Sequence, residues 1–215
     1  MWLAFAGWVI AVLLASIGGG VAVSAGAASD GSAALLMGQL GLWVGFFGTA
    51  LVAGRHFGFG DAVTGFEFSI APADLLKSVL IGVAIQLLVV PGIYLPLMAA
   101  GVDLDVSGPA VELFGKVSGL EKIAIAVGVV VIAPIAEELL FRGVLLRGLA
   151  RPLGDGRAVL ASALLFAGTH FQLVQFPGLL AIGLTLAWLA RRTAGLASPT
   201  WAHAAFNATT VALLW

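Results

Sequence analysis

Three short stretches of this sequence place ionisable or amide side chains inside long apolar segments. A carboxylate can take a proton from water as a general base, and imidazole or amide N–H groups can stabilise the negative charge that develops when water attacks a carbonyl. Charged side chains at mid-bilayer cost at least about 2.5–3.5 kcal/mol each, so those present are usually functional or paired. In chain order, the candidates are Glu137, Glu138, Arg142, Phe166, His170, His203 and Asn207.

The spacing of these residues suggests how they are grouped. Glu138 and Arg142 are four residues apart, which places them on one face of a helix and predicts an ion pair. His203 and Asn207 have the same spacing, so their side chains should point the same way. Glu137 is then the carboxylate without a partner nearby in the sequence.

The elements that position these residues must be membrane helices. Of 215 residues, 61% are hydrophobic and 10% charged, whereas a soluble domain is about half apolar and a quarter charged. The formal charge of −1 shows no basic stripe for a nucleic-acid partner, so we expect the lipid bilayer as the environment and no nucleic acid. The chain has no cysteine, which excludes thiolate catalysis and thiolate metal sites.

The hydropathy pattern predicts an all-α, polytopic transmembrane helical bundle of about seven spans, with the active site buried among spans four, five and seven. We expect the first span to be a retained helix rather than a signal peptide, because no Lys or Arg precedes Arg55. The apolar runs lie at 2–24, 33–53, 75–99, 122–149, 157–174, 178–192 and 198–215.

We expect a single membrane domain over residues 1–215. Residues 1–121 should hold N-terminal spans and interfacial segments, near 54–74 and 104–121, and residues 122–215 a catalytic core. A stripe of small residues in the second span should allow close helix packing. Its members are Gly38, Gly41, Gly45 and Gly48.

Basic residues predict the orientation of the chain. Alternating the loops between the two sides leaves only Lys116 and Lys122 opposite the main basic group, so the N-terminus should be cytoplasmic. An Ala-, Gly- and Arg-rich composition is typical of a GC-rich bacterial genome, so we expect a bacterial cytoplasmic membrane. The main basic group comprises Arg55, Lys77, Arg147, Arg151, Arg157, Arg191 and Arg192.

Counting residues predicts that three of the candidates share one depth. From the nearest arginine of the main basic group, Glu137 is 10 residues away, His170 is 13 and His203 is 11. At about 1.5 Å per helical residue, all three lie roughly 15–20 Å from that face. A buried reaction centre requires such a coincidence.

The patterns E-E-x-x-x-R, F-x-x-x-H and H-x-x-x-N, in this order, resemble the three motifs of the CAAX prenyl protease type II family, also called the CPBP or Abi group. The resemblance covers about residues 122–210. It implies an intramembrane endopeptidase that hydrolyses peptide bonds of membrane-associated or lipidated peptides or proteins.

The resemblance also implies a role for each motif residue. Glu137 would be the general base, and His170 would orient the attacking water. His203 and Asn207 would stabilise the oxyanion. The supporting residues would be Glu138, Arg142 and Phe166.

Two alternatives remain open from the sequence. A zinc site of Glu137, His170 and His203 is chemically admissible, although the absence of H-E-x-x-H and the presence of Asn207 as a donor favour a mechanism without a cofactor. A non-catalytic membrane-binding or bacteriocin-immunity protein of the same fold is the functional alternative, in which the polar residues only specify helix packing. The complete set of motif residues favours the enzyme.

Overall fold

The computed structural model describes residues 2–29, 31–57 and 66–215, and in these ranges the chain forms helices and turns without strands. Two long helices open the chain, α1 (Trp2–Ser24) and α2 (Ser32–Phe57). The next helix is continuous from Pro72 to Ala99 and comprises α3 (Pro72–Ala84), the π-helix η1 (Ile85–Val89) and α4 (Val90–Ala99). A short helix follows, α5 (Gly108–Gly115).

The C-terminal half is built on one long helix and three shorter ones. The long helix comprises α6 (Gly119–Val127), η2 (Gly128–Ile132), α7 (Ala133–Glu138), η3 (Leu139–Leu146) and α8 (Arg147–Leu153). The shorter helices are α9 (Asp155–Gly168), α10 (Phe176–Thr193) and α11 (Ala197–Leu214). The all-α prediction is confirmed.

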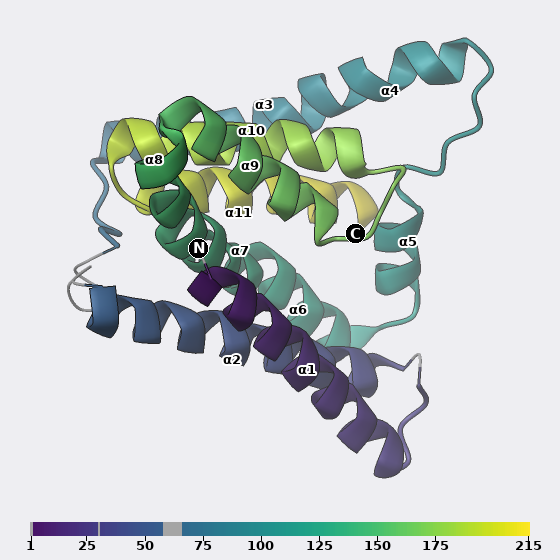
Figure 1. Cartoon of the computed structure of the whole chain (residues 1–215). Helices are drawn as coiled ribbons and strands as arrows, with labels where there is room; N and C mark the ends of the chain where they lie inside the picture. Colours follow the sequence, from purple (N-terminus) through teal and green to yellow (C-terminus); the bar gives the residue numbers. More distant parts are fainter. Residues whose placement is uncertain (1, 30, 58–65) are drawn as a thin grey trace.

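The helices associate in a few close pairs. Figure 1 shows α1 and α2 crossing in contact on one side of the bundle and the α3–α4 helix on the other, with α9, α10 and α11 between them. A Cβ on Gly41 would overlap the Leu14 backbone, and one on Gly45 would overlap Ala11. A Cβ on Gly48 would meet nothing within 4 Å outside its own helix, so the predicted small-residue stripe mediates close packing at Gly41 and Gly45 but not at Gly48.

Two of the π-helical segments end just before a proline. Pro91 follows η1 and Pro134 follows η2, each two residues after the last π-helical residue. Proline has no N–H, and its ring clashes with the carbonyl four residues earlier, so an ordinary α-helical turn is unfavourable there. The wider π-turn accommodates both residues without breaking either long helix.

Four helices are long and apolar enough to cross a membrane by length and composition, among the residues described. They are Trp2–Ser24, Ser32–Arg55, Pro72–Ala99 and Gly119–Leu153. The prediction of about seven spans is therefore met only in part. α9 has 14 residues, and α10 and α11 have 18 each with polar residues among them, so these three fall outside the set.

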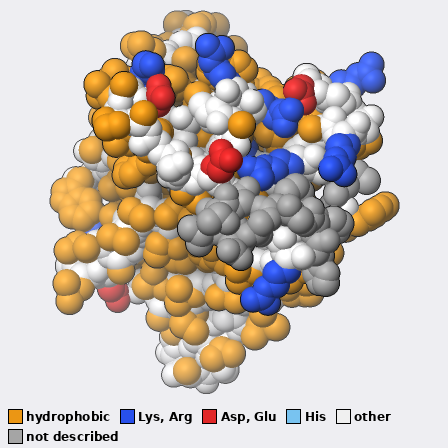
Figure 2. All heavy atoms as spheres, turned by 90° about the vertical axis from the view of Figure 1, so that its left-hand side faces the viewer, with side chains coloured by type: hydrophobic (Ala, Val, Ile, Leu, Met, Phe, Trp, Pro, Cys, Tyr) orange, Lys and Arg blue, Asp and Glu red, His pale blue; other side chains and the backbone are white. Residues whose placement is uncertain are grey.

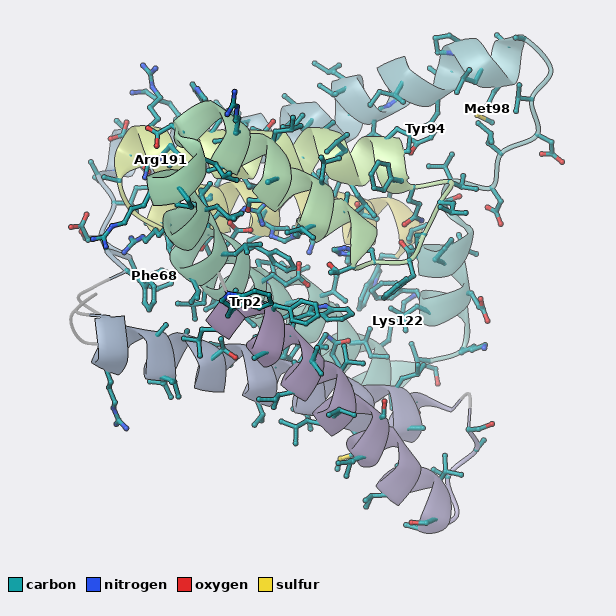
Figure 3. All side chains as sticks on the ribbon, in the orientation of Figure 1. Trp2, Phe68, Tyr94, Met98, Lys122 and Arg191 are labelled. Atoms are coloured by element: carbon teal, nitrogen blue, oxygen red, sulfur yellow. The ribbon has the colours of Figure 1, made fainter. Side chains whose placement is uncertain are left out.

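The outer surface fits lipid better than water. Large apolar side chains are exposed along the long helices, with Leu88 70% and Leu95 60% accessible. Figure 2 shows such side chains covering much of one face, while Lys and Arg gather toward one part of it. In Figure 3, Arg191 and Lys122 lie at opposite ends of the molecule. The loop pattern predicts this separation of Lys122 from Arg191, and which end is cytoplasmic stays a prediction.

Two boundaries differ from those predicted. α9 ends at Gly168, with Phe171 at a positive φ of 54°, so His170 lies in the turn after the helix rather than inside a span reaching 174. α2 continues to Phe57 and α3 begins at Pro72, so the first interfacial segment is shorter than 54–74. Residues 58–65 of that segment lie outside the described residues.

Candidate active site

A cavity of about 530 Å³ lies between the long helices and the C-terminal ones. Five of the seven predicted site residues line it, and they come from α7, α9, the turn after α9, and α11. Glu138 and Arg142 do not line the cavity. The five are Glu137, Phe166, His170, His203 and Asn207.

The two adjacent glutamates have different surroundings. The side chain of Glu138 is fully buried, and its Oε1 accepts a hydrogen bond of 2.9 Å from Arg142 Nη1. The side chain of Glu137 is 14% exposed and lines the cavity. Its buried Oε2 has no hydrogen-bond partner among the described residues. Successive helical residues point about 100° apart, so Glu138 points toward Arg142 while Glu137 points into the cavity.

His203 contacts both glutamates. Its Nδ1 lies 3.0 Å from Glu138 Oε1, and its Nε2 lies 3.8 Å from Glu137 Oε2. Because a carboxylate accepts and Arg142 already balances its charge, the Nδ1 contact is best assigned as N–H donating to Glu138. The other ring nitrogen is thereby directed at Glu137.

Arg142 is buried and links three parts of the site. Besides Glu138, it donates from Nη2 to the backbone oxygen of Gly183 on α10 at 3.0 Å. Its guanidinium carbon lies 4.5 Å from the centre of the Phe166 ring, within the range of a cation–π contact. The ion pair predicted from the spacing of Glu138 and Arg142 is present, and it also ties η3 to α9 and α10.

Phe166 is almost completely buried and touches both histidines. Its ring centre lies 4.8 Å from that of His170 and 5.7 Å from that of His203, both edge-to-face. Its backbone oxygen lies 2.7 Å from His170 Nδ1. A carbonyl can only accept, so Nδ1 carries the proton, and Nε2 of a neutral His170 is left as an acceptor.

Asn207 donates a hydrogen bond to the backbone carbonyl of Val129, which has no backbone N–H partner within the long helix. Its Nδ2 donates to Val129 O at 2.8 Å. In η2 the N–H of Ala133 bonds to Gly128 O, so the next π-type donor, for Val129 O, would come from Pro134, which has none. The side chain from α11 supplies the missing hydrogen bond, which leaves one N–H and the Oδ1 of Asn207 for other partners.

Residues 119–209 match the family model described as type II CAAX prenyl endopeptidase, Rce1-like. All seven predicted site residues fall inside this match. This segment belongs to the type II CAAX prenyl endopeptidase family. The family predicted from the three motifs is confirmed, and with the long apolar helices it makes the chain an integral membrane protein.

The type II CAAX prenyl endopeptidase segment begins with α6 and ends in α11, and it holds the long kinked helix and the cavity-lining turn. Comparison with curated proteins gives no match, and comparison with solved structures gives none either.

The described residues do not offer a ready metal site. No group of three or more His, Asp or Glu side chains within the described ranges is arranged to hold an ion. The Nδ1 atoms of both site histidines are engaged, by Phe166 O and by Glu138, which leaves their Nε2 atoms as the nitrogens able to bind an ion. The zinc alternative of Glu137, His170 and His203 stays a prediction, and we derive no step through a metal.

Sequence reasoning missed the polar residues that line the rest of the cavity. Glutamines from α2 and η1, Gln39 and Gln86, face it together with Tyr94. The rule that identified the glutamates, a polar group within an apolar span, applies equally to these two glutamines.

Proposed function

We propose that this protein is an intramembrane endopeptidase in which Glu137 activates the attacking water. The observation that carries the proposal is the position of this carboxylate. Among the described residues it is the only Asp or Glu that lines the cavity, and one of its oxygens is buried without a hydrogen-bond partner beside an imidazole. Family membership supplies the reaction class.

In the proposed reaction, Glu137 takes a proton from water, and the resulting hydroxide attacks the peptide carbonyl. His170, protonated on Nδ1, accepts a hydrogen bond from that water through Nε2. The proton held by Glu137 then passes to the leaving amine as the carbon–nitrogen bond breaks. Water is consumed, and the products are a carboxylate and an amine.

Negative charge on the carbonyl oxygen would be stabilised by donors from α11. Asn207 retains one amide N–H besides the one bound to Val129 O. His203 presents Nε2 toward Glu137, and when this nitrogen carries a proton it is a hydrogen-bond donor on a ring that Glu138 holds in place through Nδ1. Preorganised donors in a site that excludes water are usually the largest single contribution to catalysis of this kind.

The proposed substrate is a peptide or protein associated with the membrane, because the cavity lies between helices whose outer surfaces are apolar. The match to a prenyl endopeptidase family adds prenylated peptides as a specific candidate. With the main basic group on the cytoplasmic side, the N-terminus would lie in the cytoplasm.

The test is to incubate the purified protein in lipid vesicles with a library of membrane-derived peptides and to identify products by mass spectrometry. We expect Glu137→Gln to lower kcat by about 100- to 10,000-fold, the usual contribution of a general base. Glu121→Gln is the matched control, since Glu121 is an exposed glutamate at the start of the same long helix. Undiminished cleavage by Glu137→Gln would overturn the proposal, and binding without cleavage by the wild type would favour a non-catalytic protein.

A further inference from the structure

All four glutamines of this chain line the cavity that contains Glu137. They come from three parts of the sequence. One lies on α2, one on η1, and two in the turn between α9 and α10. They are Gln39, Gln86, Gln172 and Gln175.

Three of these amides have no hydrogen bond within the described part of the chain, and all four are partly buried. Gln175 is the exception, because its Nε2 donates to Val106 O at 2.6 Å. Gln39 and Gln86 belong to helices that can cross a membrane. An amide placed in an apolar medium without a partner costs several kcal/mol, so a polar group at such a position is expected to serve a partner inside the cavity.

The charge of the lining restricts what that partner can be. Among the described residues around the cavity there is no Lys, Arg or Asp, and Glu137 is the only carboxylate. The hydroxyl of Tyr94 is already engaged, since it donates to Val174 O at 2.8 Å. An acidic side chain would meet no Lys or Arg there and would approach Glu137, so acidic side chains in the bound segment are disfavoured.

Each glutamine amide offers two donor hydrogens and an acceptor oxygen. This is the complement of a peptide group, which has one N–H and one C=O. We propose that the four glutamines form a binding surface for the main-chain amides of an extended peptide segment without acidic side chains. The proposal rests on the proposed function, since it describes how the substrate of that same site is held.

The first test measures binding without catalysis. Fluorescent peptides are titrated into vesicles that contain the Glu137→Gln protein, and Gln39→Leu or Gln86→Leu is then added to that background. Each change should raise Kd about fivefold, the usual effect of removing one hydrogen bond. Leucine suits these apolar spans, so the variants should retain the helical content and the unfolding midpoint of the parent. Thr185→Val, a polar-to-apolar change that does not line the cavity, should leave Kd unchanged.

The second test changes the ligand instead of the protein. N-methylation of the peptide backbone should raise the Kd for the Glu137→Gln parent about fivefold or more. In the parent that also carries Gln86→Leu, the same methylation should raise Kd by a smaller factor, because the substitution has already removed that contact. Introducing an aspartate into the bound segment should weaken binding to the same parent at least tenfold relative to an asparagine, because the lining has no Lys or Arg to pair with it even when Glu137 is replaced.

Unchanged affinity in both glutamine variants, or equal affinity for acidic and neutral peptides, would overturn the glutamine proposal. These readouts do not depend on cleavage. If the wild type binds the peptides as expected but leaves them intact, only the proposed function is contradicted. If the wild type cleaves the peptides but the glutamine variants bind them with unchanged Kd, only this inference is contradicted.

Discussion

The α1–α2 pair and the α6–α11 half of the molecule are held together in different ways. Between α1 and α2, glycines allow the backbones to approach closely, and the side-chain hydrogen bonds of Ser16 and Thr49 go to carbonyls of their own helices. In the α6–α11 half, Arg142 and His203 connect four helices, the long α6–α8 helix, α9, α10 and α11, through buried contacts. The first arrangement provides a scaffold whose packing does not depend on polar contacts between helices. The second buries the polar side chains of the site away from lipid.

The contrast shows where polar groups are retained in a membrane protein. Without a hydrophobic force between helices in lipid, close van der Waals packing is enough to associate α1 with α2. Buried charges are stable only when they are paired, and Glu138 and Arg142 form such a pair, although Glu138 Oε2 and Arg142 Nε have no hydrogen-bond partner among the described residues. Glu137, without such a partner, is the group left for reaction.

The largest expected effect on stability comes from removing a buried charge in the α6–α11 half. Arg142→Met leaves the Glu138 carboxylate buried without its cation, which should lower the free energy of unfolding by about 3–5 kcal/mol. Denaturant titration in detergent, followed by circular dichroism, measures this.

A double variant, Glu138→Gln with Arg142→Met, removes both charges together and should recover most of the lost stability, because a neutral pair has no uncompensated charge. Equal destabilisation of the single and the double variant would show that the ion pair is not the reason for the loss.

The next effect separates catalysis from packing on α11. Asn207→Ala should lower kcat about 100- to 1,000-fold, as expected for removing one oxyanion donor, and it also removes the hydrogen bond to Val129 O. Steady-state kinetics on a cleaved peptide measures kcat and KM. Thr209→Val on the same helix, away from the cavity, is the control and should change kcat less than twofold. A full kcat with Asn207→Ala would assign this residue to packing alone.

A smaller effect is expected in the α1–α2 pair. Gly41→Ala places a methyl group against the Leu14 backbone and should lower the free energy of unfolding by about 1–3 kcal/mol. Gly48→Ala enters open space and should leave stability unchanged or raise it by up to about 1 kcal/mol. Unfolding midpoints of the two variants, compared side by side, check this difference, and equal midpoints would contradict the close packing.

The smallest expected effect is that of metal removal. Since the described side chains form no three-ligand cluster, a strong chelator should change kcat/KM by less than twofold. The measurement is cleavage before and after dialysis against chelator. Loss of activity that zinc restores would replace the glutamate mechanism with the metal mechanism.

Local patterns allowed much of this molecule to be predicted. Hydropathy indicates long helices because burial in lipid depends on side chains that are consecutive in the chain, and a four-residue spacing predicts the Glu138–Arg142 pair because it is a property of one helix. Span number was less predictable, since α9, α10 and α11 are covered by other helices and need not be apolar on all sides. The turn that carries His170 was missed because the apolar run continues to residue 174, past the end of α9 at Gly168.

By itself, the sequence determined the residues able to do chemistry, the membrane environment and the family, because residue types and short spacings specify all three. Only the tertiary structure decided that His203 bonds to Glu138, that Asn207 completes the backbone beside Pro134, and that the four glutamines meet around Glu137. The two hydrogen bonds join residues 65 and 78 positions apart in the chain, and they depend on how each helix is rotated against its neighbours, which no local pattern specifies.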